Sequence, residues 1–274
     1  MAEHGQSARL AILIDADNTS AAYAHAIFEE VAKLGEANVR RIYGDFSSDR
    51  LRSWRGVMHP LAILPQQQFN YTVGKNAADI ALVIDAMDLM HRSRLDGFCL
   101  VSSDSDFTRL AQRLREDGAL VYGFGARKTP EAFRNACSRF IYIENLLEPT
   151  GDEAVAAAAA VAAPKTKTKS DKKAKAADGA KADKQAEKPA VPVAVAPAKE
   201  PPSKAVPLIR KAMEQAWDDE EWINLGTVGQ RLNHLAPDFD PRTYGCSTLL
   251  QVVEQAGKFV VERPPGGAVR IKRR

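Results

Sequence analysis

Four aspartates stand where strands are expected to end or where a helix is expected to begin. Asp15 closes the apolar run RLAILID, and Asp104 and Asp106 follow a second apolar run, Phe98–Val101, within the stretch LVSSDSDF. Asp79 begins a long helical pattern, KNAADIALVIDAM. Carboxylates that are held close together raise one another's pKa and oppose folding unless a cation screens them. The four aspartates therefore predict a cation site.

The donor atoms predict which ion this site would bind. Carboxylate oxygens without His or Cys partners select Mg²⁺ or Mn²⁺, which keep bound waters and contact substrate phosphates. The five histidines and three cysteines show no zinc-ligand spacing. A single aspartate after a strand is a helix cap about as often as a ligand, so the prediction depends on the convergence of all four. That convergence indicates phosphate-ester chemistry.

The order of elements explains how the four side chains would meet. Between residues 8 and 146, strand-like and helix-like segments alternate. This alternation predicts an α/β fold with a parallel sheet and helices on both faces. Ligands of such folds bind outside the carboxyl ends of the strands, which is where three of the four aspartates would lie.

The helix that begins near Asp79 is predicted to pack on the sheet through one apolar face. That face comprises Leu82, Val83, Ala86, Met87 and Met90. Asp85 and Asp88 lie off it, and we expect both to face solvent.

Three segments of this half resemble the motifs of the NYN family, whose domains are PIN-like, metal-dependent ribonucleases. The segments are ILIDADN, KNAADIALVIDAM and LVSSDSDFTRLAQRLREDGALVYGFG, and they occur in the family's order. The resemblance implies a Rossmann-like, PIN-like fold and hydrolysis of RNA phosphodiesters with Mg²⁺ or Mn²⁺. The catalytic residues would be Asp15, Asn18, Asp79, Asp104 and Asp106, with the four aspartates as metal ligands.

Polar residues close to these motifs are candidates for contact with RNA. Ser102 and Ser103 precede the paired acids, and Lys75 lies one helical turn before Asp79. Arg127 and Lys128, in the loop after VYGFGA, are weaker candidates of the same kind.

Two other functions remain open for this half. The stretch AILIDADNT also satisfies the Asp-x-Asp-x-Thr signature of haloacid-dehalogenase-like phosphatases, with Asp15 as nucleophile and Asp17 as general acid and base. The lysine and late acidic motif of those enzymes do not follow in the required order. The other alternative is an RNA-binding module without turnover.

Composition divides the chain into three parts. We expect a catalytic domain at 1–150, a linker at 151–205 and a second domain at 206–274. The linker is rich in Ala, Lys and Pro and has no aromatic residue, so it cannot bury enough apolar surface to fold. Counting Lys and Arg minus Asp and Glu gives 17 − 19 = −2, 11 − 7 = +4 and 10 − 9 = +1 for the three parts. The linker lysines could therefore hold a polyanion loosely.

The last part predicts three helices and a β-hairpin, which together form a winged helix-turn-helix. The hairpin would join Phe259–Glu262 to Val269–Ile271 across a Pro-Pro-Gly-Gly turn. The stretch INLGTVGQRLNHLAPDFDPRTYGCSTLLQVVEQAGKFVVE resembles the OST-HTH, or LOTUS, domain, an RNA-associated winged helix. The residues expected to bind RNA are Arg242, Tyr244, Arg270, Lys272, Arg273 and Arg274. Contact with a protein partner is the alternative role of this domain.

The remaining features concern the compartment. No apolar run approaches the ~20 residues of a membrane span, and the amino terminus lacks the pattern of a signal peptide. Three widely spaced cysteines are typical of reduced thiols. We expect a cytoplasmic protein that does not contact a membrane, and the sequence leaves its oligomeric state open.

Overall fold

The computed structural model describes residues 7–69, 77–147, 199–215, 222–264 and 266–274. Contacts between their backbones join all of these residues into one compact unit. Two sheets with separate cores are present among these residues.

The first sheet has six parallel strands, which confirms the predicted α/β fold. The strands are β1 (Arg9–Asp15), β2 (Glu36–Gly44), β3 (Leu64–Gln67), β4 (Gly97–Val101), β5 (Leu120–Gly125) and β6 (Arg139–Tyr142). Their order across the sheet is β3-β2-β1-β4-β5-β6. The chain therefore progresses outward from β1 to β3, then returns to the centre and progresses the other way from β4. In open parallel sheets, ligands bind at this switch point, which here lies between β1 and β4.

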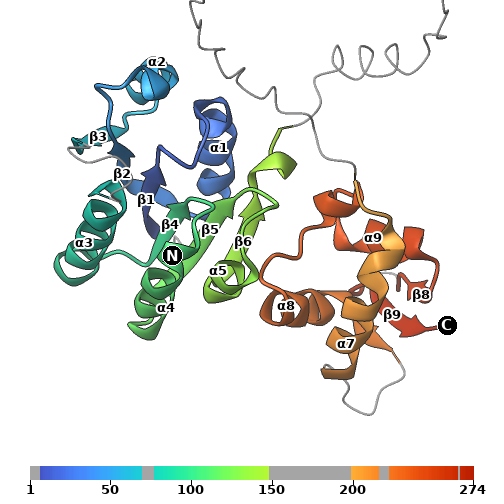
Figure 1. The fold of residues 1–274 in the computed structure, drawn as a ribbon. Coiled ribbons are helices and arrows are strands. Elements are labelled where there is room, and N and C mark those ends of the chain that lie inside the picture. Colours follow the sequence, from blue (N-terminus) through green and yellow to red (C-terminus); the bar gives the residue numbers. More distant parts are fainter. Residues whose placement is uncertain (1–6, 70–76, 148–198, 216–221, 265) are drawn as a thin grey trace, which may run out of the picture. The chain divides into compact units, whose positions relative to one another are not determined.

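Helices cover both faces of this sheet (Figure 1). One face packs against α3 (Ala77–Arg92), α4 (Thr108–Glu116) and α5 (Glu131–Ala136). The other packs against α1 (Ala24–Leu34) and α2 (Arg52–Met58). Side chains of β1 alternate between the two cores, as a strand period of two requires: Leu13 faces the first group and Ile14 the second. Short 3-10 turns precede several helices: η1 (Ala21–Tyr23), η2 (Asp49–Leu51) and η3 (Ser105–Phe107); a fourth, η4 (Ile143–Asn145), follows β6.

Asp85 of α3 does not face solvent, and that expectation was wrong. Its side chain is 22% exposed, and its carboxylate accepts hydrogen bonds from Arg41 and from the hydroxyl of Tyr43, both on β2. The helical period places Asp85 beside the apolar face of α3. The period of one helix does not show that two polar residues, Arg41 and Tyr43, lie on the sheet beneath it. Asp88 is 51% exposed, as expected, and pairs with Arg92 at 3.4 Å.

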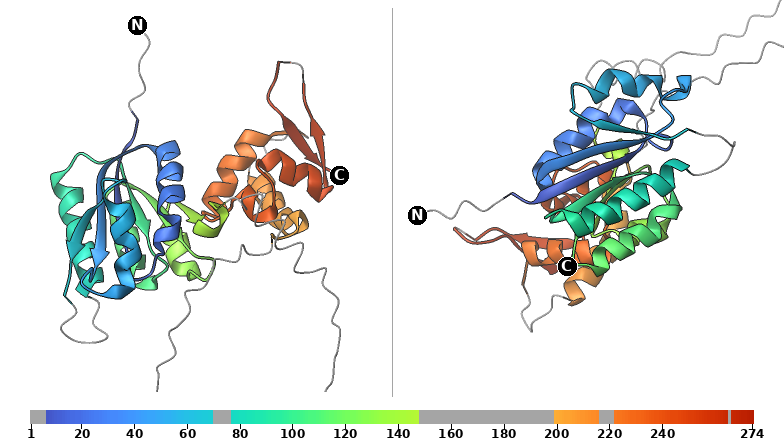
Figure 2. Two further views of the ribbon diagram at one scale, coloured as in Figure 1. Left: turned by 90° about the horizontal axis from the view of Figure 1, so that it is seen from above. Right: turned by 90° about the vertical axis from the view of Figure 1, so that its left-hand side faces the viewer.

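The carboxyl-terminal half contains the predicted three helices and hairpin. The helices are α7 (Val206–Gln215), α8 (Leu225–Leu235) and α9 (Leu249–Ala256), with the short turns η5 (Pro202–Ala205) and η6 (Pro241–Tyr244). Strands β8 (Phe259–Glu262) and β9 (Arg270–Arg273) are antiparallel, and Figure 2 shows them as the two arms of a hairpin. A two-residue strand, β7 (Ile223–Asn224), pairs with β9 and was too short to show a period in the sequence.

α9 ends at Gly257, which has a φ of 63°, a left-handed conformation that glycine adopts without strain. Ile209, Leu232 and Val253 pack together in the core of this half. Among the described residues, no helix is long and apolar enough to cross a membrane.

Candidate active site

The loop after β1 closes around the carboxylate of Asp15, which is 1% exposed. Its Oδ1 accepts hydrogen bonds from the backbone N–H groups of Asp17 (3.1 Å) and Asn18 (3.3 Å). Its Oδ2 accepts hydrogen bonds from Asn18 Nδ2 (2.8 Å) and Ser102 Oγ (2.7 Å). Burial raises the pKa of Asp15, and the hydrogen bonds from Ser102 and Asn18 oppose that rise. These contacts hold the carboxylate in one orientation.

Ser102 joins the ends of the two central strands. Ile14 pairs with Val101, so Ser102 leaves β4 beside Asp15. The hydroxyl of Ser102 donates to Asp15 and accepts a hydrogen bond from the N–H of Asp104 at 3.0 Å. With 1% of its surface exposed, Ser102 is part of the support of the site.

The paired acids follow directly. Asp104 is the N-cap of η3, where its Oδ1 accepts a hydrogen bond from the N–H of Asp106 at 2.9 Å. Ser103 Oγ accepts a hydrogen bond from the N–H of Ala126 at 2.8 Å, which ties this turn to the loop after β5. Asp104 therefore caps a helix, and capping leaves its other oxygen for a second role.

Asp79 lies in the first turn of α3 and shows that the acids converge. Burial, which has the largest effect, and the charges of Asp15, Asp104, Asp106 and Asp17, in that order, together raise the pKa of Asp79 to about 6. Such mutual effects require the carboxylates to be close. Three chain segments, from β1, α3 and β4, therefore bring acids to one edge of the sheet.

The chemistry of this donor set fits a hard divalent cation. All the donors are carboxylate oxygens, and the repulsion that raises the pKa of Asp79 is what a bound cation would relieve. Within the described residues, no three His, Cys, Asp or Glu side chains are already arranged as a metal-binding group. The side chains of Asp79, Asp104 and Asp106 would therefore have to turn toward an ion. Each is only partly buried or exposed, so each has room to do so.

Comparison with family models identifies two domains in the chain. The model of the NYN domain matches residues 9–144, and the model of the OST-HTH/LOTUS domain matches residues 197–271. The chain therefore contains an NYN domain followed by an OST-HTH/LOTUS domain. NYN domains are PIN-like and typically nucleases, and OST-HTH domains bind RNA.

Solved structures add similar chains without a stated function. A protein of unknown function from Vibrio parahaemolyticus RIMD 2210633 is 19% identical, with a TM-score of 0.44, over 52% of this chain and 96% of that one. An uncharacterized protein from Nitrosomonas europaea is 37% identical, with a TM-score of 0.24, over 34% of this chain and 91% of that one. No curated protein matches the sequence.

The NYN domain also places a residue beside the acids that the sequence analysis missed. Arg50, on η2, donates from Nη2 to the main-chain oxygen of Asp17 at 2.9 Å and lies 3.6 Å from its Oδ1. Trp54, 1% exposed, anchors the following helix by donating from Nε1 to the oxygen of Thr19 at 3.2 Å. The segment SDRLRSWRG, with three arginines around one tryptophan, was the available signal.

The other cationic candidates of the NYN domain are Lys75 and the weaker candidates Arg127 and Lys128. Lys75 lies outside the described residues. The guanidinium of Arg127 donates to Asn145 Oδ1 at 3.1 Å and lies over the ring of Tyr142. Lys128 is exposed.

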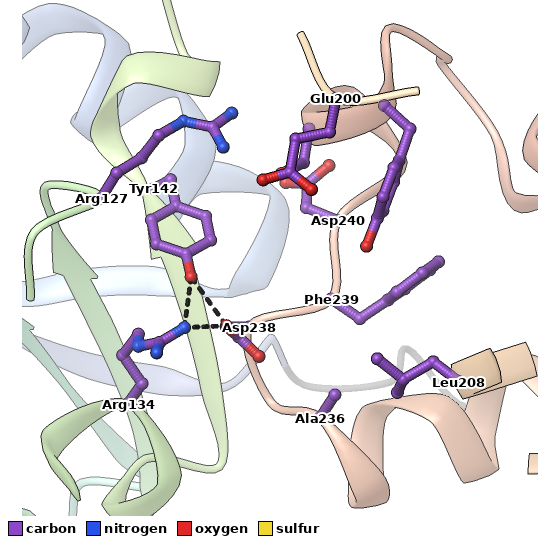
Figure 3. Close-up of a pocket in the computed structure, with 11 residues that line it drawn as sticks. Arg127, Arg134, Tyr142, Glu200, Leu208, Ala236, Asp238, Phe239 and Asp240 are labelled. Carbon is purple, nitrogen blue, oxygen red and sulfur yellow. Dashed lines mark hydrogen bonds and ion pairs between the residues drawn. The ribbon is translucent and has the colours of Figure 1, made fainter. Parts of the chain in front are cut away.

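Two residues of the OST-HTH domain that were predicted to bind RNA contact other side chains. Arg242 donates hydrogen bonds to Asp240 and to Glu30 of α1. Burial lowers the pKa of Arg242, but the hydrogen bonds and charges of these two carboxylates together have the larger effect and raise it. Tyr244 packs 5.8 Å from the ring of Phe239 and lines a pocket. In the same pocket, Asp238 accepts hydrogen bonds from Arg134 and from the hydroxyl of Tyr142, as Figure 3 shows.

Three of the four basic residues at the end of the wing also contact other groups of the protein. Lys272 lies 4.8 Å from the centre of the Trp222 ring, Arg273 donates to Glu214 at 2.7 Å, and Arg274 donates to the oxygen of Gly257 at 3.1 Å. Arg270, on β9, is exposed. RNA binding by all of these residues stays a prediction.

Proposed function

We propose that the NYN domain hydrolyses RNA phosphodiesters with Mg²⁺ or Mn²⁺ and that the OST-HTH domain binds the RNA. The observation that carries the proposal is the convergence of the acids at one edge of the sheet, where burial and then the charges of four other aspartates raise the pKa of Asp79. Repulsion between carboxylates destabilises the metal-free fold, and it is characteristic of sites that bind a cation together with a phosphate. The family assignment supports the same chemistry.

The four acids would have different roles. Asp15 is the fixed ligand, because Ser102 and Asn18 orient its carboxylate. Asp104 and Asp106, from the turn after β4, and Asp79, from α3, would complete the ligand set, and one of these carboxylates would also position the attacking water. A divalent ion held by these oxygens supplies charge neutralisation at the phosphate and a bound water of lowered pKa.

The OST-HTH domain would supply affinity for RNA. The part of the chain that holds the site has a net charge of −2, so it repels a polyanion. Exposed Arg270, the other basic residues of the wing and the linker lysines would provide the opposite charge. Contact with a protein partner through the same domain remains an alternative.

The proposal also includes a cytoplasmic location. Cys99, Cys137 and Cys246 are free thiols, which a reducing compartment maintains.

Removal of metal tests the proposed activity. We expect the purified chain to cleave labelled single-stranded or structured RNA in Mn²⁺ or Mg²⁺, to stop in excess EDTA, and to recover when either ion, but not Zn²⁺ alone, is added. Cleavage that continues in EDTA would contradict a metal-dependent reaction.

A further inference from the structure

We propose that Arg50 contacts an RNA phosphate beside the acidic site and that Asp17 holds the guanidinium of Arg50 in position for this contact. This inference rests on the proposed function, because the contact has a purpose only if RNA binds at the acids. It assigns roles to two residues: Arg50, which the sequence analysis did not single out, and Asp17, which is not one of the four predicted ligands.

The geometry leaves most of the guanidinium available to a ligand. Both contacts with Asp17, to its main-chain oxygen at 2.9 Å and its carboxylate at 3.6 Å, use Nη2. Within the described part of the chain, Nε and Nη1 of Arg50 make no hydrogen bond to protein, and the side chain is 68% exposed. A guanidinium held through one nitrogen presents the other edge as a fork that fits two phosphate oxygens.

The element that carries Arg50 is firmly attached to the site. Leu51 and Trp54 are 4% and 1% exposed, and the Trp54 ring nitrogen bonds the loop that also holds Asp15. Ser48 caps η2, and Arg55 bonds the oxygen of Phe46 at 2.5 Å. The position of Arg50 is therefore set by the same loop that orients the buried ligand, as precise recognition of a phosphate requires.

Charge gives the contact its purpose. The carboxylates repel the phosphate that they are proposed to act on, and a cation on the protein offsets that repulsion. Arg127, in the loop after β5, already contacts Asn145 and the Tyr142 ring. Arg50 instead lies against Asp17, whose charge acts on Asp79.

The test compares Arg50→Gln with Arg92→Gln. Arg92 is also an exposed arginine paired with an aspartate, but it ends α3, about 20 Å along the helix from Asp79. We expect Arg50→Gln to lower kcat/KM for RNA cleavage by about 10- to 100-fold, the range for a lost hydrogen bond to a charged group. Arg92→Gln should stay within twofold of the wild type. Both variants should unfold at the wild-type temperature, because both side chains are exposed.

Two further measurements separate a phosphate contact from a structural effect. In an Asp104→Asn background, where RNA is bound but not cut, Arg50→Gln should lower the slope of log Kd against log salt by about 0.7. Asp17→Asn should reduce kcat/KM less than Arg50→Gln does, and the effects should not add, because one residue acts through the other.

The outcomes distinguish this proposal from the function on which it rests. If the wild type cleaves RNA while Arg50→Gln matches Arg92→Gln in rate and salt slope, the contact is refuted and the ribonuclease stands. If the wild type neither cleaves nor binds RNA in Mn²⁺ or Mg²⁺, the proposed function fails, and the contact fails with it.

Discussion

Replacing Asp79 by Asn should stabilise the metal-free protein while it abolishes cleavage. Asp79 has a pKa of about 6 in the folded protein against 3.8 for an ordinary aspartate, so its ionised form opposes folding. The full difference corresponds to about 3 kcal/mol, which screening by solvent at this half-buried position reduces to about 1 kcal/mol. Asn removes that cost, and about 1 kcal/mol raises Tm by about 2–4 °C in a chain of this size.

The sign of the effect depends on pH and can be checked by thermal unfolding in EDTA. The cost of Asp79 is complete above pH 6 and disappears as the pH falls from 6 toward 3.8, where the folded protein takes up the proton. The gain from Asp79→Asn should therefore be present at pH 7.5 and nearly absent at pH 4. Asp88→Asn, on the exposed side of the same helix, is the control and should change Tm by less than about 1 °C. A variant that is less stable than the wild type at pH 7.5 would refute the proposed repulsion.

Four further outcomes follow from the contacts. Binding of Mn²⁺, followed by calorimetry, should weaken as the pH falls below about 6, because protonated Asp79 cannot bind an ion. Asp85→Asn should lower the free energy of unfolding by about 1–3 kcal/mol in a denaturant titration, because Arg41 and Tyr43 lose a charged partner. Ser102→Ala should lower kcat while the fold, checked by circular dichroism, persists. A fragment of residues 206–274 should bind RNA without cutting it, and replacing its wing cations by Ser should weaken binding and reduce its salt dependence; no affinity at low salt would indicate a protein-contact domain.

The sequence predicted the fold where hydrophobic period and chain order determine it. Uniformly apolar β1 and β4 indicated central parallel strands, and strand ends with acids indicated an edge with a ligand site. The sequence did not predict β7, because two residues are too few to show the period of a strand. Its pairing with β9 depends on a partner that lies far along the chain.

Side-chain partners were harder to predict than the positions of elements. Asp85 and Arg242 look exposed by period and by charge, yet each contacts residues that are distant in sequence. Arg50 was missed because its importance comes from Asp17, on a loop that the order of strands brings beside it. The pattern of a single sequence shows which side of a strand or helix is buried. Tertiary packing determines which charged side chains form pairs.

The central claim is that converging aspartates hold an ion that cleaves RNA, and one measurement addresses it most directly. The initial rate of cleavage of end-labelled RNA in Mn²⁺ should be compared between the wild type and Asp104→Asn. We expect metal-dependent cleavage by the wild type and a rate at least about 100-fold lower for the variant, equivalent to about 3 kcal/mol of transition-state stabilisation. Equal rates for the two proteins would contradict the account.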